Sequence, residues 1–118
     1  MSLSAFIDDG YTREGTIAEA PRLWPAASIS YRPMIASEYA EFSVKSKNLD
    51  NLAWHKAVVE ILEKKLIAWD VKNAAGDSVE IKRENLLRLM PGFLLRVWQI
   101  VSGDTPDDGT DEKNWPTG

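Results

Sequence analysis

The chain has 118 residues, 44% of them hydrophobic and 27% charged, which is the usual composition of one small globular domain. It contains no cysteine, so disulfides and thiolate metal sites are excluded. Residues 104–118 hold five of the 18 acidic residues and one of the 14 basic ones, which leaves residues 1–103 without net charge. A neutral body lacks the basic field that non-specific nucleic-acid binding needs. The first ten residues resemble neither a signal peptide nor a membrane span, so we expect a soluble, cytoplasmic protein.

The first third of the chain predicts short strands separated by turns. Asp9 and Gly10 form a tight-turn signal between the apolar residues 5–7 and the segment that begins at Tyr11. Farther on, Ile29 and Tyr31 alternate with polar residues, and a proline follows them. This pattern predicts an edge strand.

Two helices are predicted next. Ser37 is placed to cap a helix that extends to about residue 47, and Asp50 is placed to cap a longer one that extends to about residue 66. The longer helix has a broad apolar face that includes Trp54, Val58 and Leu62, so we expect it at the centre of the core.

A β-hairpin and a pair of helices are predicted after the long helix. Residues 69–71 and 79–81 alternate around a loop in which Gly76 can adopt a positive φ. A short helix over residues 84–90 is then followed by a second one, with Pro91 in its first turn and Gly103 at its end.

These elements together predict an α+β fold that is mostly helical. It has short N-terminal strands, a long central helix, a β-hairpin and a C-terminal helix pair. We assign residues 1–103 to a single globular domain. Residues 104–118 are acidic and offer little to bury, so we expect a disordered tail.

The sequence shows no catalytic residue and no cofactor or metal site. His55 is the only histidine, so a nucleophile–base pair or a histidine-rich metal cluster cannot be assembled, and we expect His55 to be structural. An enzyme whose site combines Asp70, His55 and Arg32 is the alternative. Lys65 falls on the apolar face of its helix, and we expect it to reach Asp70 or solvent, or to form a buried ion pair that orients the hairpin.

The last helix has more apolar surface than a surface helix needs. On a helical projection its apolar residues span an arc of roughly 160°, against about 100° for a helix that packs on one side. Either other elements of this small domain enclose the helix, or another protein covers part of the arc. We favour a protein interface, with anchors at Trp98 and Phe93. The predicted interface consists of Phe93, Leu94, Leu95, Val97, Trp98 and Val101.

The chain resembles the small tail-assembly chaperones and tail accessory proteins of tailed phages and prophages. Two stretches, covering under half of the chain, carry the resemblance through their order and spacing. They are Tyr31-Arg32-Pro33 after an apolar strand, and Trp69-Asp70-Val71, Gly76, Ile81, Glu84-Asn85-Leu86, Leu89 and Pro91 before a closing apolar helix. Lys82 departs from the pattern, since a serine or threonine cap is expected there.

The resemblance implies a non-enzymatic protein of the bacterial host cytoplasm that binds the tape-measure protein or tail-tube subunits during tail assembly. A virion tail component that associates with itself is the alternative within the same class. In either case the partner is a protein, and no nucleic acid, membrane, cofactor or small-molecule ligand is expected.

Overall fold

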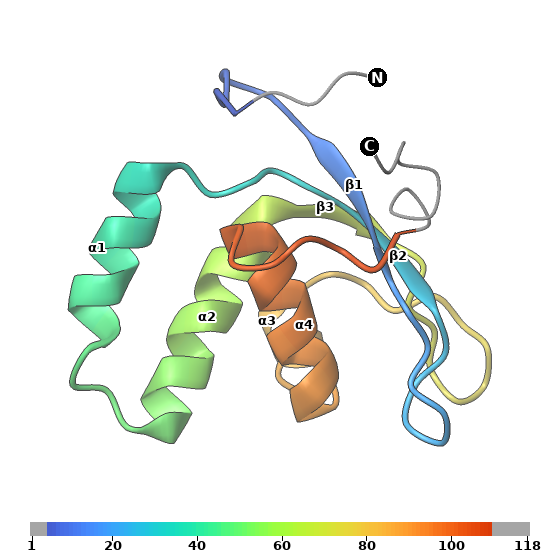
Figure 1. Cartoon of the computed structure of the whole chain (residues 1–118). Helices are drawn as coiled ribbons and strands as arrows, with labels where there is room; N and C mark the ends of the chain where they lie inside the picture. The colour runs from blue at the N-terminus through green and yellow to red at the C-terminus, as the bar shows by residue number, and fades with distance from the viewer. Residues whose placement is uncertain (1–4, 110–118) are drawn as a thin grey trace.

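The computed structural model describes residues 5–109 and confirms the α+β class. Within these residues, three strands form one antiparallel sheet and four helices pack beside it (Figure 1). In chain order the elements are β1 (Arg13–Ile17), β2 (Ala27–Tyr31), α1 (Ala36–Ser46), α2 (Asn51–Lys65), β3 (Leu66–Trp69), α3 (Arg83–Leu86) and α4 (Pro91–Ser102).

The sheet has the order β1-β2-β3, so β2 is its central strand and the predicted edge position is wrong. Gly15 of β1 pairs with Ile29, and Ile29 pairs with Trp69 of β3. The strand ends at Tyr31, two residues before Pro33, so the proline interrupts no ladder of hydrogen bonds. The turn at Gly10 is present with φ 79°, but residues 5–7 form no strand.

The two long helices begin near their predicted positions. The Asp50 carboxylate accepts the Ala53 N–H at 2.8 Å and caps α2 as expected. The predicted cap at Ser37 is wrong, because α1 already begins at Ala36. There the Glu38 carboxylate accepts the Ile35 N–H at 3.0 Å and stabilises the first turn.

The predicted hairpin is present in reduced form. Lys72 pairs with Ser78 in a single bridge, and Gly76 has the expected positive φ of 87°. The indole N–H of Trp69 donates to the Val79 carbonyl at 2.6 Å and holds the hairpin against β3. Of the two C-terminal helices, α3 has only four residues, whereas α4 has Pro91 in its first turn and Gly103 at its end as predicted.

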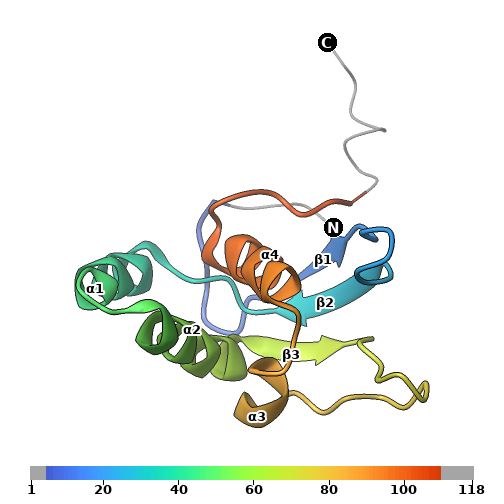
Figure 2. The ribbon, with the colours of Figure 1, turned by 90° about the horizontal axis from the view of Figure 1, so that it is seen from below.

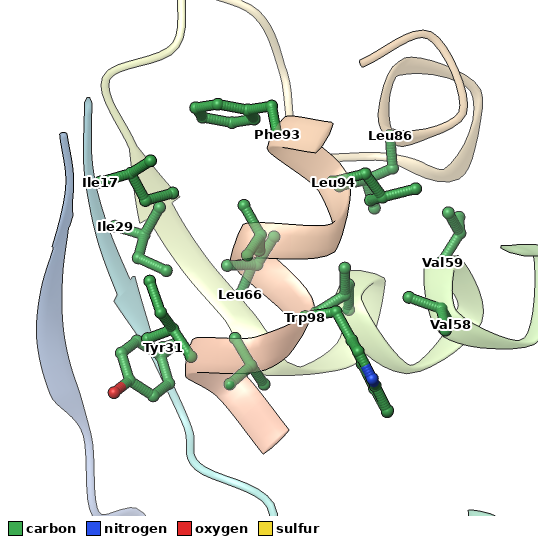
Figure 3. Packing of buried hydrophobic residues seen from close by; sticks show 14 of the residues in the cluster. Ile17, Ile29, Tyr31, Val58, Val59, Leu66, Leu86, Phe93, Leu94 and Trp98 are labelled. Carbon is green, nitrogen blue, oxygen red and sulfur yellow. The ribbon is translucent and has the colours of Figure 1, made fainter. Parts of the chain in front are cut away.

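Helix α4 lies between the sheet and the α1–α2 pair (Figure 2). Figure 3 shows Ile17, Ile29 and Tyr31 of the strands on one side of α4, and Val58, Val59 and Leu86 on the other. Because apolar side chains reach this helix from two sides, its wide apolar arc is covered within the domain. The core is therefore organised around α4 rather than around α2.

The segment that follows α4 turns back along β1 instead of leaving the domain (Figure 1). The expected disorder does not hold for residues 104–109, because the Asp108 N–H donates to the Thr16 carbonyl at 2.7 Å. The remainder of the expected tail, residues 110–118, lies outside the described residues.

Candidate functional site

The predicted interface on α4 is almost entirely core. Phe93, Leu94, Val97, Trp98 and Val101 are all buried, and only Leu95 is exposed. The ring of Trp98 lies 4.6 Å from that of Phe42 and 6.3 Å from that of Trp54, measured between centroids. The favoured prediction of a protein interface on α4 is therefore wrong, and the alternative holds, because other elements of the domain enclose the helix.

The residues of the alternative enzyme site are not brought together. His55 lies in the first half of α2, where its Nδ1 contacts the Asn51 carbonyl at 2.8 Å and its ring packs on Trp54. The Arg32 N–H donates to the carbonyl of Lys65, ten residues farther along α2, or about 15 Å at the helical rise. Asp70 accepts the Ser28 N–H at 2.8 Å.

Lys65 forms its ion pair with Glu38 instead of Asp70. The two side chains meet at 2.8 Å between Lys65 Nζ and Glu38 Oε1. Burial opposes ionisation of Glu38, but the hydrogen bonds from Lys65 and from the Ile35 N–H outweigh it and lower the pKa of this carboxyl. The pair therefore joins α1 to the end of α2 and does not orient the hairpin.

Within residues 5–109, no three histidine, aspartate or glutamate side chains gather in a way that could hold a metal ion. In the same range no helix combines the length and hydrophobicity that crossing a bilayer requires. A groove lined mostly by apolar residues lies at the N-terminal end of α4.

We define this apolar groove by Leu23, Trp24, Val71, Leu89, Met90 and Phe93. It has a volume of about 630 Å³, and ten of its fourteen lining residues are apolar. A volume of this size lies within the range of ordinary ligand pockets, about 300–1,000 Å³. Leu23 and Met90 are 56% and 45% exposed, so the groove presents apolar side chains to solvent.

The loop between β1 and β2 forms one wall of the groove. Ala20 and Trp24 exchange two backbone hydrogen bonds of 2.9 and 3.0 Å, which close a tight loop with Arg22 at φ 70°. The Trp24 indole N–H donates to the Ala18 carbonyl at 3.0 Å. Leu23 is thereby held at the tip of a fixed loop.

The floor of the groove forms where this loop meets the start of α4. The rings of Trp24 and Phe93 meet edge to face, with 5.6 Å between their centroids. The Trp24 ring also lies close to Gly92, since a Cβ at that position would be only 3.2 Å from it. Glycine at position 92 therefore lets the ring lie against the helix.

The polar residues on the rim of the groove differ in how they are paired. Asp70 is hydrogen-bonded to the backbone of β2. Lys72 and Arg88 are exposed, and neither forms an ion pair within residues 5–109. The groove thus combines an apolar floor with two cations that can meet acidic groups of a partner.

Of the residues that define the groove, only Phe93 belongs to a helix and was among the predicted interface residues. The others were missed because they lie in loops, where no periodicity marks them. One signal was available: Leu23 and Trp24 stand between Pro21 and Pro25, in a segment too constrained to join a regular core element. Met90 gives no comparable signal.

Comparisons of the chain with protein-family models, curated proteins and solved structures give no match.

Proposed function

We propose that this protein is a non-enzymatic binding factor in the assembly of phage or prophage tails. Its client is the tape-measure protein or a tail-tube subunit, met in the bacterial cytoplasm. An apolar segment of the client, flanked by acidic residues, occupies the apolar groove. The motif resemblance supports the tail context, and the exposed groove carries the proposal of protein binding.

The groove suits such a client because its apolar atoms are already in place. Trp24 is fixed by its hydrogen bond to Ala18 and by the ring of Phe93, so little conformational entropy is lost there on binding. Leu23 and Met90 add exposed apolar area that a client side chain can cover. The nearby Lys72 and Arg88 favour a client with acidic flanks over one with basic flanks.

The proposal is tested by capture of purified client from the same phage or prophage. Leu23→Ser and Met90→Ser replace exposed apolar side chains of the groove, and each should weaken binding by at least about tenfold, equal to about 1.4 kcal/mol. Val44→Ser is the matched control. Val44 is 78% exposed but lies on α1, outside the groove, so its replacement should leave capture unchanged.

Far-UV circular dichroism is the check that all three variants are folded. Folded groove variants that bind the client as tightly as the natural chain would contradict the proposal. Concentration-dependent oligomers in light scattering, lost in the Leu23→Ser and Met90→Ser variants, would instead assign the groove to self-association.

A further inference from the structure

A second surface, distinct from the apolar groove, lies along the outer edge of β1. Because β1 is an edge strand, the backbone groups that point away from β2 are open to another strand. Gly15 pairs with Ile29, and the outward groups belong to the alternate residues Glu14, Thr16 and Ala18. Edges of this kind accept extended peptides.

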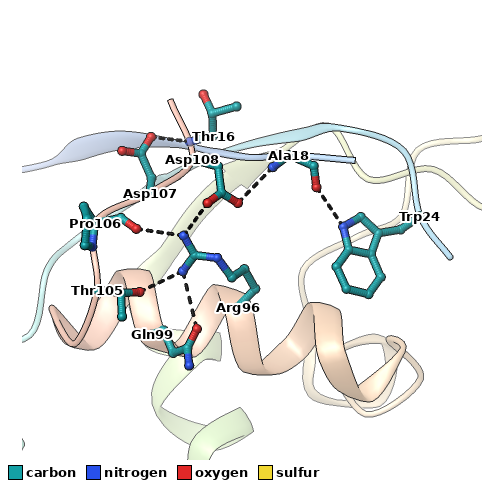
Figure 4. A network of polar contacts seen from close by, with 9 residues as sticks. All are labelled: Thr16, Ala18, Trp24, Arg96, Gln99, Thr105, Pro106, Asp107 and Asp108. Carbon is teal, nitrogen blue, oxygen red and sulfur yellow. Dashed lines mark hydrogen bonds and ion pairs between the residues drawn. The ribbon is translucent and has the colours of Figure 1, made fainter. Parts of the chain in front are cut away.

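Residues 104–109, which we call the strap, occupy part of this edge (Figure 4). The Asp107 carboxylate accepts the Thr16 N–H at 2.6 Å, and the Asp108 carboxylate accepts the Ala18 N–H at 3.0 Å. The Asp108 N–H completes the set by donating to the Thr16 carbonyl at 2.7 Å. Asp107 and Asp108 therefore fill hydrogen-bonding positions on β1 that the backbone of a neighbouring strand would otherwise fill.

Arg96 of α4 fixes the strap from the other side. Its guanidinium donates to Thr105 Oγ1 at 2.8 Å, to the Pro106 carbonyl at 2.7 Å and to Asp108 Oδ1 at 2.7 Å (Figure 4). At the start of the strap, the Tyr39 hydroxyl donates to Asp104 Oδ1 at 2.9 Å. The receptor for the strap is thus a row of backbone amides with a guanidinium beside it.

The strap covers the edge incompletely. Its hydrogen bonds reach Thr16 and Ala18, but within the described residues none reaches Glu14, whose backbone groups point the same way. The strap also contributes no large apolar side chain, and its position depends on polar contacts that are largely open to water. A longer strand could make the same contacts and pair with Glu14 as well.

We propose that the outer edge of β1 is a docking site for an extended acidic segment of a partner protein, and that the strap is a built-in competitor for it. The chemistry follows from the receptor, because two backbone N–H groups and a guanidinium require acceptors, and neighbouring carboxylates supply them. A tethered strap has a high effective concentration, so only a partner that makes additional contacts displaces it.

This inference goes beyond binding at the apolar groove and is tested separately from it. The probe is a peptide of residues 102–109, added to the full chain carrying Asp107→Ala and Asp108→Ala, which frees the edge but leaves Arg96 in place. The matched control peptide has alanine for both of its adjacent aspartates. Binding is followed by the amide NMR signals of Thr16 and Ala18.

The variant should bind the acidic peptide at least about tenfold more tightly than the natural chain does, because the natural strap competes. The alanine peptide should bind at least about tenfold more weakly to the variant than the acidic one. Equal affinity for the two peptides, or signal changes that spare Thr16 and Ala18, would overturn the proposal. Oligomers of the natural chain formed by exchange of straps would also overturn it, since the occupant would then be a second copy.

Tyr39→Phe provides a milder opening if the double variant does not fold. It removes the hydroxyl that anchors Asp104 and touches neither β1 nor Arg96. The Thr16 and Ala18 amides should then exchange with solvent faster than in the natural chain, and added acidic peptide should slow them again. Unchanged exchange at both amides would count against a displaceable strap.

Discussion

Helix α4 and the strap are neighbours in the chain, yet different kinds of interaction hold them in place. Apolar contacts on two sides bury α4, whereas hydrogen bonds and one ion pair hold the strap at the surface. The two predictions were wrong in opposite directions, since part of the helix was expected to face a partner and residues 104–109 were expected to be disordered.

The difference shows what an apolar pattern can and cannot indicate. The width of an apolar arc reports how many neighbours a helix has, and it does not say whether those neighbours belong to the same chain. An acidic segment with few apolar residues is expected to be disordered only when no specific donor binds its carboxylates. Here Arg96 and two amides of the β1 edge donate hydrogen bonds to them, and the two amides lie about 90 residues earlier in the chain.

The largest expected effect on stability comes from truncating a buried apolar side chain of α4. Trp98→Ala removes a ring that packs between Phe42 and Trp54 and is 4% exposed. We expect the free energy of unfolding to fall by about 3–5 kcal/mol, measured by urea denaturation. An interface role for Trp98 would instead leave the isolated protein stable.

Leu95→Ala is the control on the same helix. Leu95 is 45% exposed, so its truncation should change the free energy of unfolding by no more than about 0.5 kcal/mol. Similar losses in the two variants would contradict the assignment of Trp98 to the core and Leu95 to the surface.

A smaller effect is expected where the two regions meet. A Cβ added at Gly15 would lie 3.3 Å from Ile100 of α4 and 3.4 Å from Asp107 of the strap. Gly15→Ala should therefore lower the free energy of unfolding by about 1–2 kcal/mol through overpacking. Because the strap can yield more easily than the core, the Thr16 amide should exchange faster in this variant, as measured by hydrogen exchange.

Gly76→Ala provides a contrast for that substitution. Among residues 5–109, no atom beyond its chain neighbours lies within 4 Å of a Cβ at Gly76, so the cost there arises from its φ of 87°. It should destabilise the hairpin loop without altering exchange at Thr16. Faster exchange at Thr16 in both variants would mean that Gly15→Ala acts through general destabilisation.

The parts of the fold that the sequence predicted depend on local signals. Asp50 caps α2 through a residue three positions away, and Pro91 and Gly103 bound α4 through their own backbone preferences. The alternation of Ile29 and Tyr31 likewise identified a strand, since one face of that strand is buried.

The features that were missed depend on contacts between distant residues. Which strand lies at the centre of the sheet is set by the pairing of Ile29 with both Gly15 and Trp69. Lys65 pairs with Glu38, 27 residues earlier in the chain, because the start of α1 lies beside the end of α2. The groove and the strap receptor likewise combine residues from separate elements, so a local pattern marks at most one part of either, as Pro21 and Pro25 do for the loop of the groove.

The smallest expected effect is on the pH dependence of the stability that the strap contributes through Asp108. The hydrogen bond and charge of Arg96, together with the Ala18 N–H, outweigh burial and lower the pKa of Asp108. The folded protein therefore binds fewer protons at this carboxyl than the unfolded chain does. Its contribution to stability is present above the ordinary aspartate pKa of about 4, and it is lost as the pH falls through the lowered pKa of the folded state.

Asp108→Asn should remove this part of the acid dependence, with a change of less than about 1 kcal/mol because the ion pair with Arg96 is partly open to solvent. The measurement is the free energy of unfolding between about pH 2 and pH 6. Some loss of stability in acid should remain in the variant, since Glu38 has its pKa lowered by the separate contact with Lys65. An unchanged pH profile would mean that the contact of Asp108 with Arg96 does not contribute to the stability of the fold.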